Sequence, residues 1–228
     1  SEFVHEAIKD LKTVGIIRED LEKGILEIAS PVGVIAAIIP STNPTSTAIN
    51  KALIALKSRN SIVFSPHPSA SGCIQEASEI LATAAEAAGA PEGVIGCLST
   101  ISVQGTQELM KHKKTSLILA TGGKGLVKAA YSVGKPAFGV GPGNVPAYIE
   151  SSADISQAVK AIFTGKCFDN GTLCSSEQSI VTDKMVEAQV VQEIERNGGH
   201  FLNKDEIEVL GELVVTANQE INPKIVGR

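Results

Sequence analysis

Residues 32–68 read VGVIAAII PSTNPTSTAINKALIALKSRN SIVFSPHP, and this stretch decides the fold class. An apolar run at 32–39 is followed by a small polar turn, a helix-length segment at 46–57 rich in Ala and Leu, and a second apolar run that begins at 61. Runs that are apolar at every position are typical of strands buried on both faces, which occur in parallel sheets covered by helices. The stretch therefore predicts a βαβ unit.

The same alternation continues toward the C-terminus and extends the sheet. We expect strands at 32–39, 61–64, 93–98, 116–120 and 145–150, and helices at 46–57, 69–88, 103–111 and 124–133. This order predicts an α/β fold with a Rossmann-like parallel sheet. Ligands of such sheets bind beyond the carboxyl ends of the strands, so the loops at 40–45, 65–68 and 121–123 are the important ones.

The two ends of the chain follow a different pattern. Residues 1–30 predict a short amphipathic helix and then an edge or oligomerisation segment, whereas the part after 150 predicts a helix near 157–163, a strand at 179–182 and a helix at 184–195. We place a domain boundary near Glu150, between a cofactor-binding domain at 1–150 and the start of an α/β catalytic domain at 151–228. The missing initial Met and the polar final segment predict a piece of a longer protein.

Composition excludes several classes of function. The 228 residues carry a net charge of -5 without a dense run of Lys or Arg, which argues against nucleic acid and anionic membranes as partners. The apolar run at 32–39 is too short to span a membrane. The four cysteines form no C-x-x-C pair and have no His at zinc-finger spacing, so neither a metal nor a disulfide is expected. The composition predicts a cytoplasmic protein.

The segment FDNGTLCSSEQS contains the strongest candidate for a catalytic residue, Cys174. The Gly-Thr pair and the small residues let backbone N–H groups crowd around this cysteine and favour its thiolate form. A thiolate is the nucleophile needed to add to a carbonyl carbon. The alternative is a buried structural cysteine in a loop.

The segment PSTNPTS follows the first strong strand and contains Asn43. At the end of a sheet, the side-chain amide of Asn43 can donate a hydrogen bond to a developing oxyanion. The alternative is an ordinary turn, because Asn-Pro and Ser-Thr are common turn formers and Ser46 can cap the next helix.

The segment ATGGKG lies between a strand and a helix, so the backbone amides of Gly122 and Gly123 can face a phosphate at the helix N-terminus. It lacks the full G-x-G-x-x-G and G-x-x-x-x-G-K-[ST] spacings, and a tight turn is the alternative. His67, between two prolines in SPHPS, is on the ligand side of the sheet, although a lone histidine of this kind is often structural.

Taken in this order, the segments PSTNPT, FSPHPSA, ATGGKG with FGVGPGNVP, and KCFDNGTLCSSEQS resemble the aldehyde dehydrogenase superfamily. Each segment alone is weak evidence, but the ordered set is specific, and it extends from about Pro31 to the end. Within the superfamily the chain resembles the coenzyme A-acylating branch, which includes the acetaldehyde dehydrogenase half of bifunctional aldehyde/alcohol dehydrogenases and the propionaldehyde and ethanolamine-pathway enzymes.

The resemblance implies a mechanism. Cys174 matches the nucleophile that adds to the aldehyde, while Asn43 and the backbone N–H of Cys174 match the donors that hold the oxyanion. Hydride then passes to NAD and leaves an acyl thioester on Cys174. The residues that match the cofactor site are Thr121, Gly122 and Gly123 at the pyrophosphate, Ser65 and His67 near the adenosine ribose, and Val140 and Gly141 on the nicotinamide side.

Two departures from the family sharpen the expectation. Hydrolytic members have a Lys and a Glu where this chain has Ser65-Pro66-His67-Pro68, so NADP stays open beside NAD. FGVGPGNVP lacks the carboxylate that activates water in those members, which favours the thiol of coenzyme A as the acceptor. We therefore expect a short-chain aldehyde, CoA and NAD⁺ to give acyl-CoA and NADH.

Two other functions remain alternatives: a hydrolytic aldehyde dehydrogenase and a non-catalytic nucleotide-binding or assembly module. The family resemblance also implies a homo-oligomer, at least a dimer. It leaves a bacterial microcompartment open beside the cytoplasm as the location.

Overall fold

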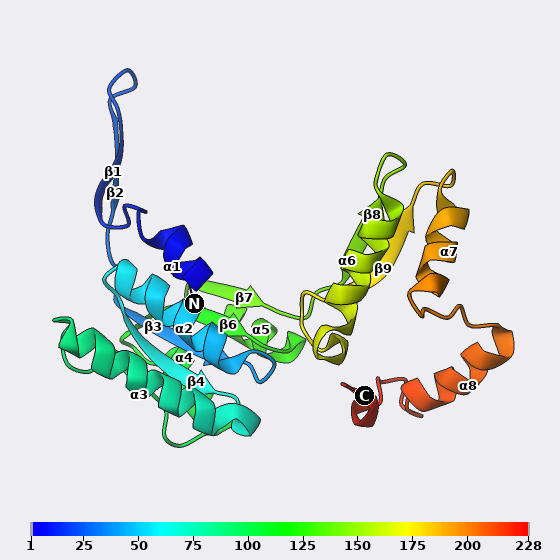
Figure 1. The fold of residues 1–228 in the computed structure, drawn as a ribbon. Helices are drawn as coiled ribbons and strands as arrows, with labels where there is room; N and C mark the ends of the chain where they lie inside the picture. The colour runs from blue at the N-terminus through cyan, green and yellow to red at the C-terminus, as the bar shows by residue number, and fades with distance from the viewer. Residues whose placement is uncertain (1, 228) are drawn as a thin grey trace. The chain divides into compact units, whose positions relative to one another are not determined.

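The computed structural model describes residues 2–227 (Figure 1). The chain divides into two compact units, Ser1–Pro142 and Gly143–Arg228. The first unit contains a five-stranded sheet and a two-stranded ribbon, the second a two-stranded sheet, and each unit has its own buried apolar residues. None of the helices within residues 2–227 has both the length and the apolar character needed to cross a membrane.

The first unit is built on a five-stranded sheet in which every pair of neighbouring strands is parallel. Its order is β5-β4-β3-β6-β7. The strands are β3 (Val34–Ile39), β4 (Ser61–Pro66), β5 (Ile95–Cys97), β6 (Thr115–Thr121) and β7 (Ala137–Val140). The α/β class with a parallel sheet is therefore confirmed. The sequence analysis missed β7, a four-residue edge strand whose alternating burial gives no continuous apolar run.

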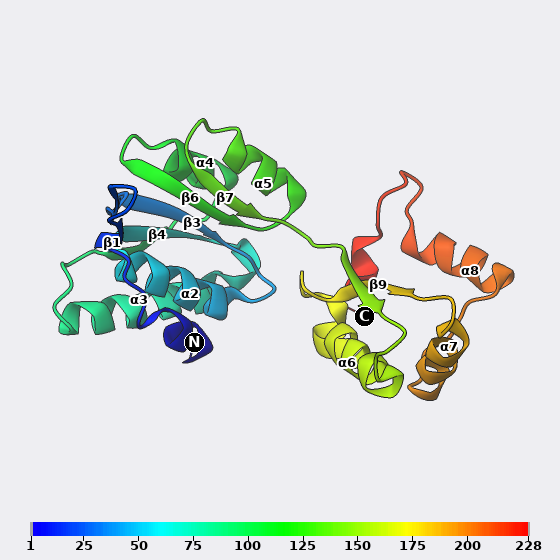
Figure 2. The ribbon, with the colours of Figure 1, turned by 90° about the horizontal axis from the view of Figure 1, so that it is seen from above.

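Helices cover both faces of this sheet. Figure 2 shows α2 (Pro44–Lys57) and α3 (Ser71–Ala87) on one face, and α4 (Val103–Lys111) and α5 (Lys124–Tyr131) on the other. A short 3₁₀ helix, η1 (Pro68–Ala70), precedes α3. The expected helix at 69–88 is thus divided in two, and the expected helix at 46–57 begins slightly earlier, at Pro44.

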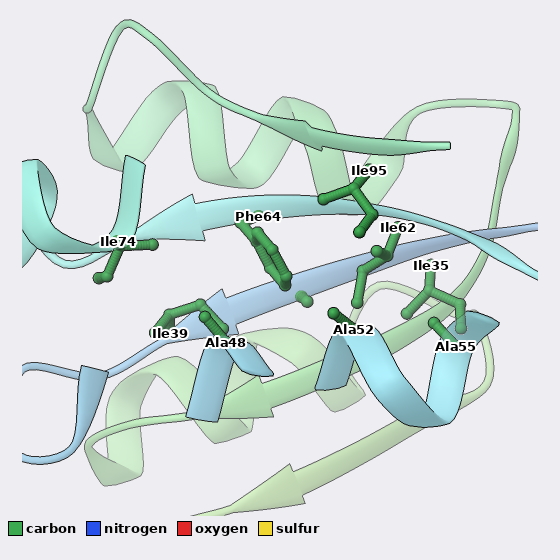
Figure 3. Packing of buried hydrophobic residues seen from close by; sticks show 10 residues of the cluster. Ile35, Ile39, Ala48, Ala52, Ala55, Ile62, Phe64, Ile74 and Ile95 are labelled. Carbon is green, nitrogen blue, oxygen red and sulfur yellow. The ribbon is translucent and has the colours of Figure 1, made fainter. Parts of the chain in front are cut away.

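The core explains why the strands are apolar at every position. Figure 3 shows Phe64 and isoleucines of β3, β4 and β5 packed against α2 and α3, where Ala48, Ala52 and Ala55 are fully buried. Alanine lets the helix axis approach the sheet closely. A second cluster occupies the other face and consists of Ala36, Ile38, Met110, Ile118, Ala120 and Ala130. Burial on both faces is the feature expected of a parallel sheet.

The N-terminal part of this unit is a helix followed by a hairpin. The helix α1 (Glu2–Ile8) is short, and β1 (Gly15–Asp20) pairs antiparallel with β2 (Ile25–Ala29). Within residues 2–227, these two strands pair only with each other. The segment expected to form an edge is therefore a separate two-stranded ribbon.

The second unit is a smaller βαβ arrangement. Its strands β8 (Val145–Ile149) and β9 (Glu177–Thr182) are parallel, and the connection between them contains α6 (Ile155–Cys167) and the 3₁₀ segment η2 (Phe168–Gly171). The helices α7 (Glu187–Arg196) and α8 (Lys204–Val214) and the 3₁₀ helix η3 (Pro223–Ile225) follow. The buried core consists of Ile149, Val159, Val186 and Val190.

The pairing of β8 differs from the expectation. The sequence analysis placed the strand at 145–150 in the first domain, with the boundary near Glu150. In the structure β8 pairs with β9, and the division of the chain into compact units falls between Pro142 and Gly143. The hydrogen-bonding partner of a parallel strand comes from beyond a crossover helix, so a local pattern does not reveal it.

Candidate active site

Four neighbouring strands of the first unit end at one edge of the sheet. Parallel pairing aligns their last residues, as the partners Ile39 and Pro66, Ile38 and Ala120, and Thr121 and Val140 show. The loops that carry Asn43, His67 and Thr121 therefore leave the sheet at its carboxyl edge. This edge is where ligands of open α/β sheets bind.

Asn43 occupies the N-cap position of α2 but does not use its side chain as a cap. Its backbone carbonyl accepts a hydrogen bond from the N–H of Thr47 at 3.1 Å, and its Oδ1 accepts a weak one from Thr42 at 3.4 Å. Within residues 2–227, the amide nitrogen of Asn43 donates to nothing. Ser46 lies in the first turn of α2 and is not the cap. The Asn43 amide is therefore half-buried and free to donate to a ligand.

The turn Thr121-Gly122-Gly123 connects β6 to α5. The N–H of Gly122 donates to the carbonyl of Val140 at 3.0 Å, so this amide holds the end of β7 and is not available to a phosphate. A Cβ on Gly122 would lie 2.6 Å from a methyl carbon of Leu126, whereas the space around Gly123 is open. The amides left for an anion are those of Gly123 and the first turn of α5.

Val140 and Gly141 lie beside this turn. Val140 is the last residue of β7 and is 53% exposed. The Cβ position of Gly141 lies 4.0 Å from the carbonyl oxygen of Gly122. The structure thus brings together two groups of residues that the sequence analysis assigned separately to the cofactor.

Ser65 and His67 have local partners. Ser65 is buried, and its hydroxyl lies 2.8 Å from that of Thr106, which ties the end of β4 to α4. His67 is exposed, and its Nδ1 accepts the N–H of Ser69 at 3.2 Å and lies 2.8 Å from the Ser69 hydroxyl. These contacts agree with the structural role considered for His67, and within residues 2–227 its Nε2 forms no hydrogen bond.

In the second unit, Cys174 lies in the loop between η2 and β9 and is exposed. Among the described residues, the sulfurs of Cys73 and Cys97 form hydrogen bonds, whereas that of Cys174 forms none. The preceding residues Asp169, Asn170 and Gly171 have φ values of 51°, 52° and 69°. Asp, Asn and Gly are the residues that tolerate this left-handed conformation. The residues DNG therefore set the path of the backbone that leads to Cys174.

The backbone of Cys174 packs closely against the backbone of Gly143. A Cβ on Gly143 would lie 2.6 Å from the Cys174 carbonyl oxygen, so only glycine fits there without movement of the main chain. The N–H of Ser176 donates to the carbonyl of Leu173 at 3.1 Å and closes a turn around the cysteine. Ser176 Oγ and Glu177 Oε2 are buried without a hydrogen-bonding partner in the described part of the chain. Polar atoms without partners therefore concentrate next to Cys174.

The other cysteines differ from Cys174 in their surroundings. Burial raises the pKa of Cys97 to about 11, and the carboxylate of Glu79 acts in the same direction, so Cys97 stays a protonated thiol at neutral pH. Cys73 and Cys167 are exposed, and Cys167 is the last residue of α6. Within residues 2–227, no group of three or more His, Cys, Asp or Glu side chains is arranged to hold a metal ion.

The sequence analysis missed Lys51, which is only 7% exposed. Its Nζ donates to the carbonyls of Ile38 at 2.8 Å and Leu119 at 2.9 Å, near the ends of β3 and β6. Burial lowers the pKa of Lys51 to about 7. One signal was available, because Lys51 lies on the apolar stripe of α2 formed by Ala48, Ala52 and Ala55.

Comparison with known proteins shows the family to which the chain belongs. The model of the aldehyde dehydrogenase family matches residues 1–198. The chain is 48% identical over 228 residues to the bifunctional aldehyde-alcohol dehydrogenase AdhE of Escherichia coli K12, covering 100% of this chain and 26% of that protein. The chain thus spans about a quarter of the length of this curated relative.

Two solved structures agree with this match. An acetylating aldehyde dehydrogenase from Geobacillus thermoglucosidasius is 57% identical with a TM-score of 0.89, covering 99% of this chain and 50% of its own. A propionaldehyde dehydrogenase from Rhodopseudomonas palustris with bound propionyl-CoA is 35% identical with a TM-score of 0.79, covering 87% and 44%. The chain described here belongs to the aldehyde dehydrogenase family.

Proposed function

We propose that this chain contains the cofactor-binding region and the nucleophile of a CoA-acylating aldehyde dehydrogenase. The reaction converts a short-chain aldehyde, CoA and NAD⁺ into acyl-CoA and NADH. The names of similar proteins support this proposal, since they include an acetylating aldehyde dehydrogenase and a propionaldehyde dehydrogenase with bound propionyl-CoA.

Cys174 and Asn43 perform the first chemical step in this proposal. The thiolate of Cys174 forms a bond to the carbonyl carbon, and the carbonyl oxygen takes the electron pair as an oxyanion. The free amide of Asn43 and the backbone N–H of Cys174 donate to that oxygen. Loss of hydride from the carbon then leaves an acyl thioester on Cys174. The exposure of the thiol and the unused Asn43 donor support these roles.

The turn after β6 is the proposed place for the cofactor pyrophosphate. A bound nicotinamide dinucleotide supplies the hydride acceptor. Gly123 is open to a close approach, and α5 begins there without a side-chain cap, so its first amides are free to bind an anion. Thr121, Gly122, Val140 and Gly141 shape the same turn. Ser65 and His67 are proposed to lie near the adenosine ribose. Residues 65–68 contain no carboxylate that could accept hydrogen bonds from the ribose hydroxyls. We propose NAD, with NADP as the alternative to test.

One observation favours CoA over water as the acceptor: residues 138–146, FGVGPGNVP, contain no carboxylate. Water needs a base to attack the thioester at neutral pH. A thiol is a better nucleophile and needs less assistance. In the final step, the CoA sulfur bonds to the acyl carbon, the bond to Cys174 breaks, and the cysteine is restored.

Assembly is a further part of the proposal. The strands β1 and β2 expose Ile16, Ile17, Ile25, Leu26 and Ile28. An isolated two-stranded ribbon is at best marginally stable in water, and this one displays apolar side chains. These features support a homo-oligomer of at least two copies. As its location we propose the cytoplasm or a bacterial microcompartment.

The test is NADH formation from acetaldehyde and NAD⁺ by the full-length protein, with and without CoA. We expect activity that requires CoA, yields acetyl-CoA and disappears in Cys174→Ala. Equal production of free acetate with and without CoA would instead assign a hydrolytic enzyme. No activity with any short aldehyde, together with slow alkylation of Cys174, would favour a non-catalytic module.

A further inference from the structure

A buried lysine connects the two strand ends from which the proposed site begins. Lys51 is on α2, and its Nζ donates to the carbonyls of Ile38 in β3 and Leu119 in β6. The chain continues from Ile38 to the loop of Asn43, and from Leu119 to the turn at Thr121. The strand order reverses between β3 and β6, since β4 and β5 follow on one side and β6 and β7 on the other. Lys51 therefore bridges the switch point of the sheet.

Within residues 2–227, no carboxylate forms an ion pair with Lys51. Neither β3, β4 nor β6 contains an ionisable side chain, and the only other such group within α2 is Lys57, whose Nζ donates to the carbonyl of Lys9. The ionisable side chains of the two helices packed against α2 are all exposed; they are Glu2, His5 and Glu6 of α1 and Cys73, Glu76, Glu79 and Glu86 of α3. The ammonium group is thus solvated by two backbone carbonyls.

A buried cation without a counter-ion attracts an anion at the neighbouring strand ends, because charges interact strongly where water is excluded. The dinucleotide proposed for the turn after β6 has a negatively charged pyrophosphate. We propose that Lys51 is a positioning residue of this dinucleotide site, holding the ends of β3 and β6 for the ligand, and that dinucleotide binding is accompanied by uptake of a proton by its amine. This inference rests on the proposed cofactor site.

The direction of the pH dependence follows from linkage. In the free protein burial places the pKa of Lys51 at about 7, and a bound anion raises it. Below that pKa the lysine is already charged, so affinity is highest and independent of its titration. Above it, protonation must accompany binding, and Kd rises by up to about tenfold for each pH unit until the pKa of the complex is reached. The neutral amine keeps two N–H groups, so the bridge to both carbonyls survives.

The experiment is calorimetric titration of NAD⁺ into the full-length protein at about pH 8, in two buffers that differ in ionisation enthalpy. The difference in heat gives the number of protons taken up, which we expect to approach one. Lys51→Met should bind without this uptake and with a Kd that no longer rises above neutral pH. Lys57→Met, on the same helix, should behave like the unaltered protein.

His67 is a second ionisable side chain at this edge, so His67→Asn serves to separate the two. This variant should keep the proton uptake. Binding of NAD⁺ by the unaltered protein with no proton exchange would overturn the role of Lys51, as would uptake that disappears in His67→Asn. Both results remain informative if Lys51→Met fails to fold. Failure of NAD⁺ to bind at any pH would instead reject the proposed cofactor site itself.

Discussion

The two proposed catalytic side chains are held by very different surroundings. Asn43 follows the central strand of a five-stranded sheet that is buried on both faces. Cys174 lies in a loop before a two-stranded sheet whose buried cluster comprises four residues. The position of Asn43 therefore depends on packing spread over many side chains, whereas that of Cys174 depends on a few local backbone contacts. This difference determines which substitutions affect folding and which affect chemistry.

The largest effect should come from the cysteine itself. Cys174→Ala removes the only protein atom proposed to form a covalent bond with the substrate, so we expect kcat to fall by roughly four orders of magnitude or more. The urea midpoint should hardly move, because the side chain is exposed. Steady-state NADH formation measures the first quantity. Cys167→Ala is the matched control, and an equal loss of activity there would remove the assignment of Cys174.

Truncation of one buried side chain in each core should show how the two units differ in their contribution to the free energy of unfolding. Phe64 is fully buried, and Phe64→Ala should lower the free energy of unfolding by about 3–5 kcal/mol. Val159→Ala deletes less buried surface in the smaller core and should cost about 1–2 kcal/mol. Urea unfolding followed by circular dichroism compares them. A greater cost at Val159 would contradict the picture of a strongly packed first unit.

Asn43→Ala should affect chemistry while leaving the sheet intact. The side chain makes no cap hydrogen bond, so its removal should change the unfolding free energy little. Loss of an oxyanion donor typically costs roughly 10²–10³ in kcat. The rate of thioester formation in a single turnover is the measurement to make. Asn50→Ala, at an exposed position of the same helix, is the control and should be as active as the unaltered protein.

The smallest effect tests the local contact in the second unit. A methyl group on Gly143 would lie 2.6 Å from the carbonyl oxygen of Cys174. Because this oxygen is a backbone atom, it cannot move away as easily as the end of a flexible side chain. Gly143→Ala should displace the cysteine loop and slow alkylation of Cys174 by about tenfold, at a cost in stability of about 1–3 kcal/mol. Gly211→Ala, in α8 with open space around it, should be neutral or stabilising. Identical alkylation rates in the two variants would show that Gly143 does not position the nucleophile.

Several parts of the site were predictable from sequence because their signals are local. The apolar runs gave the expected strands of the central sheet apart from β7, and the helix expected at 103–111 is present with those bounds. The loops with Asn43, His67 and Thr121 were expected at the carboxyl edge, since parallel strands place their ends together. The residues DNG before Cys174 adopt the left-handed conformations that their side chains permit.

Other features arise only when distant segments meet. The edge strand β7, the pairing of β8 with β9 and the contact of Gly143 with Cys174 each depend on partners far along the chain. The hydrogen bond from the Gly122 N–H to the Val140 carbonyl and the burial of Lys51 also depend on residues distant in the sequence. The sequence by itself determined the α/β class, the order of the central elements and the candidate residues, because local periodicity and turn chemistry encode them. Strand pairing, the burial of a charge and the availability of each donor were decided by the tertiary structure, because they depend on which groups fill the space around them.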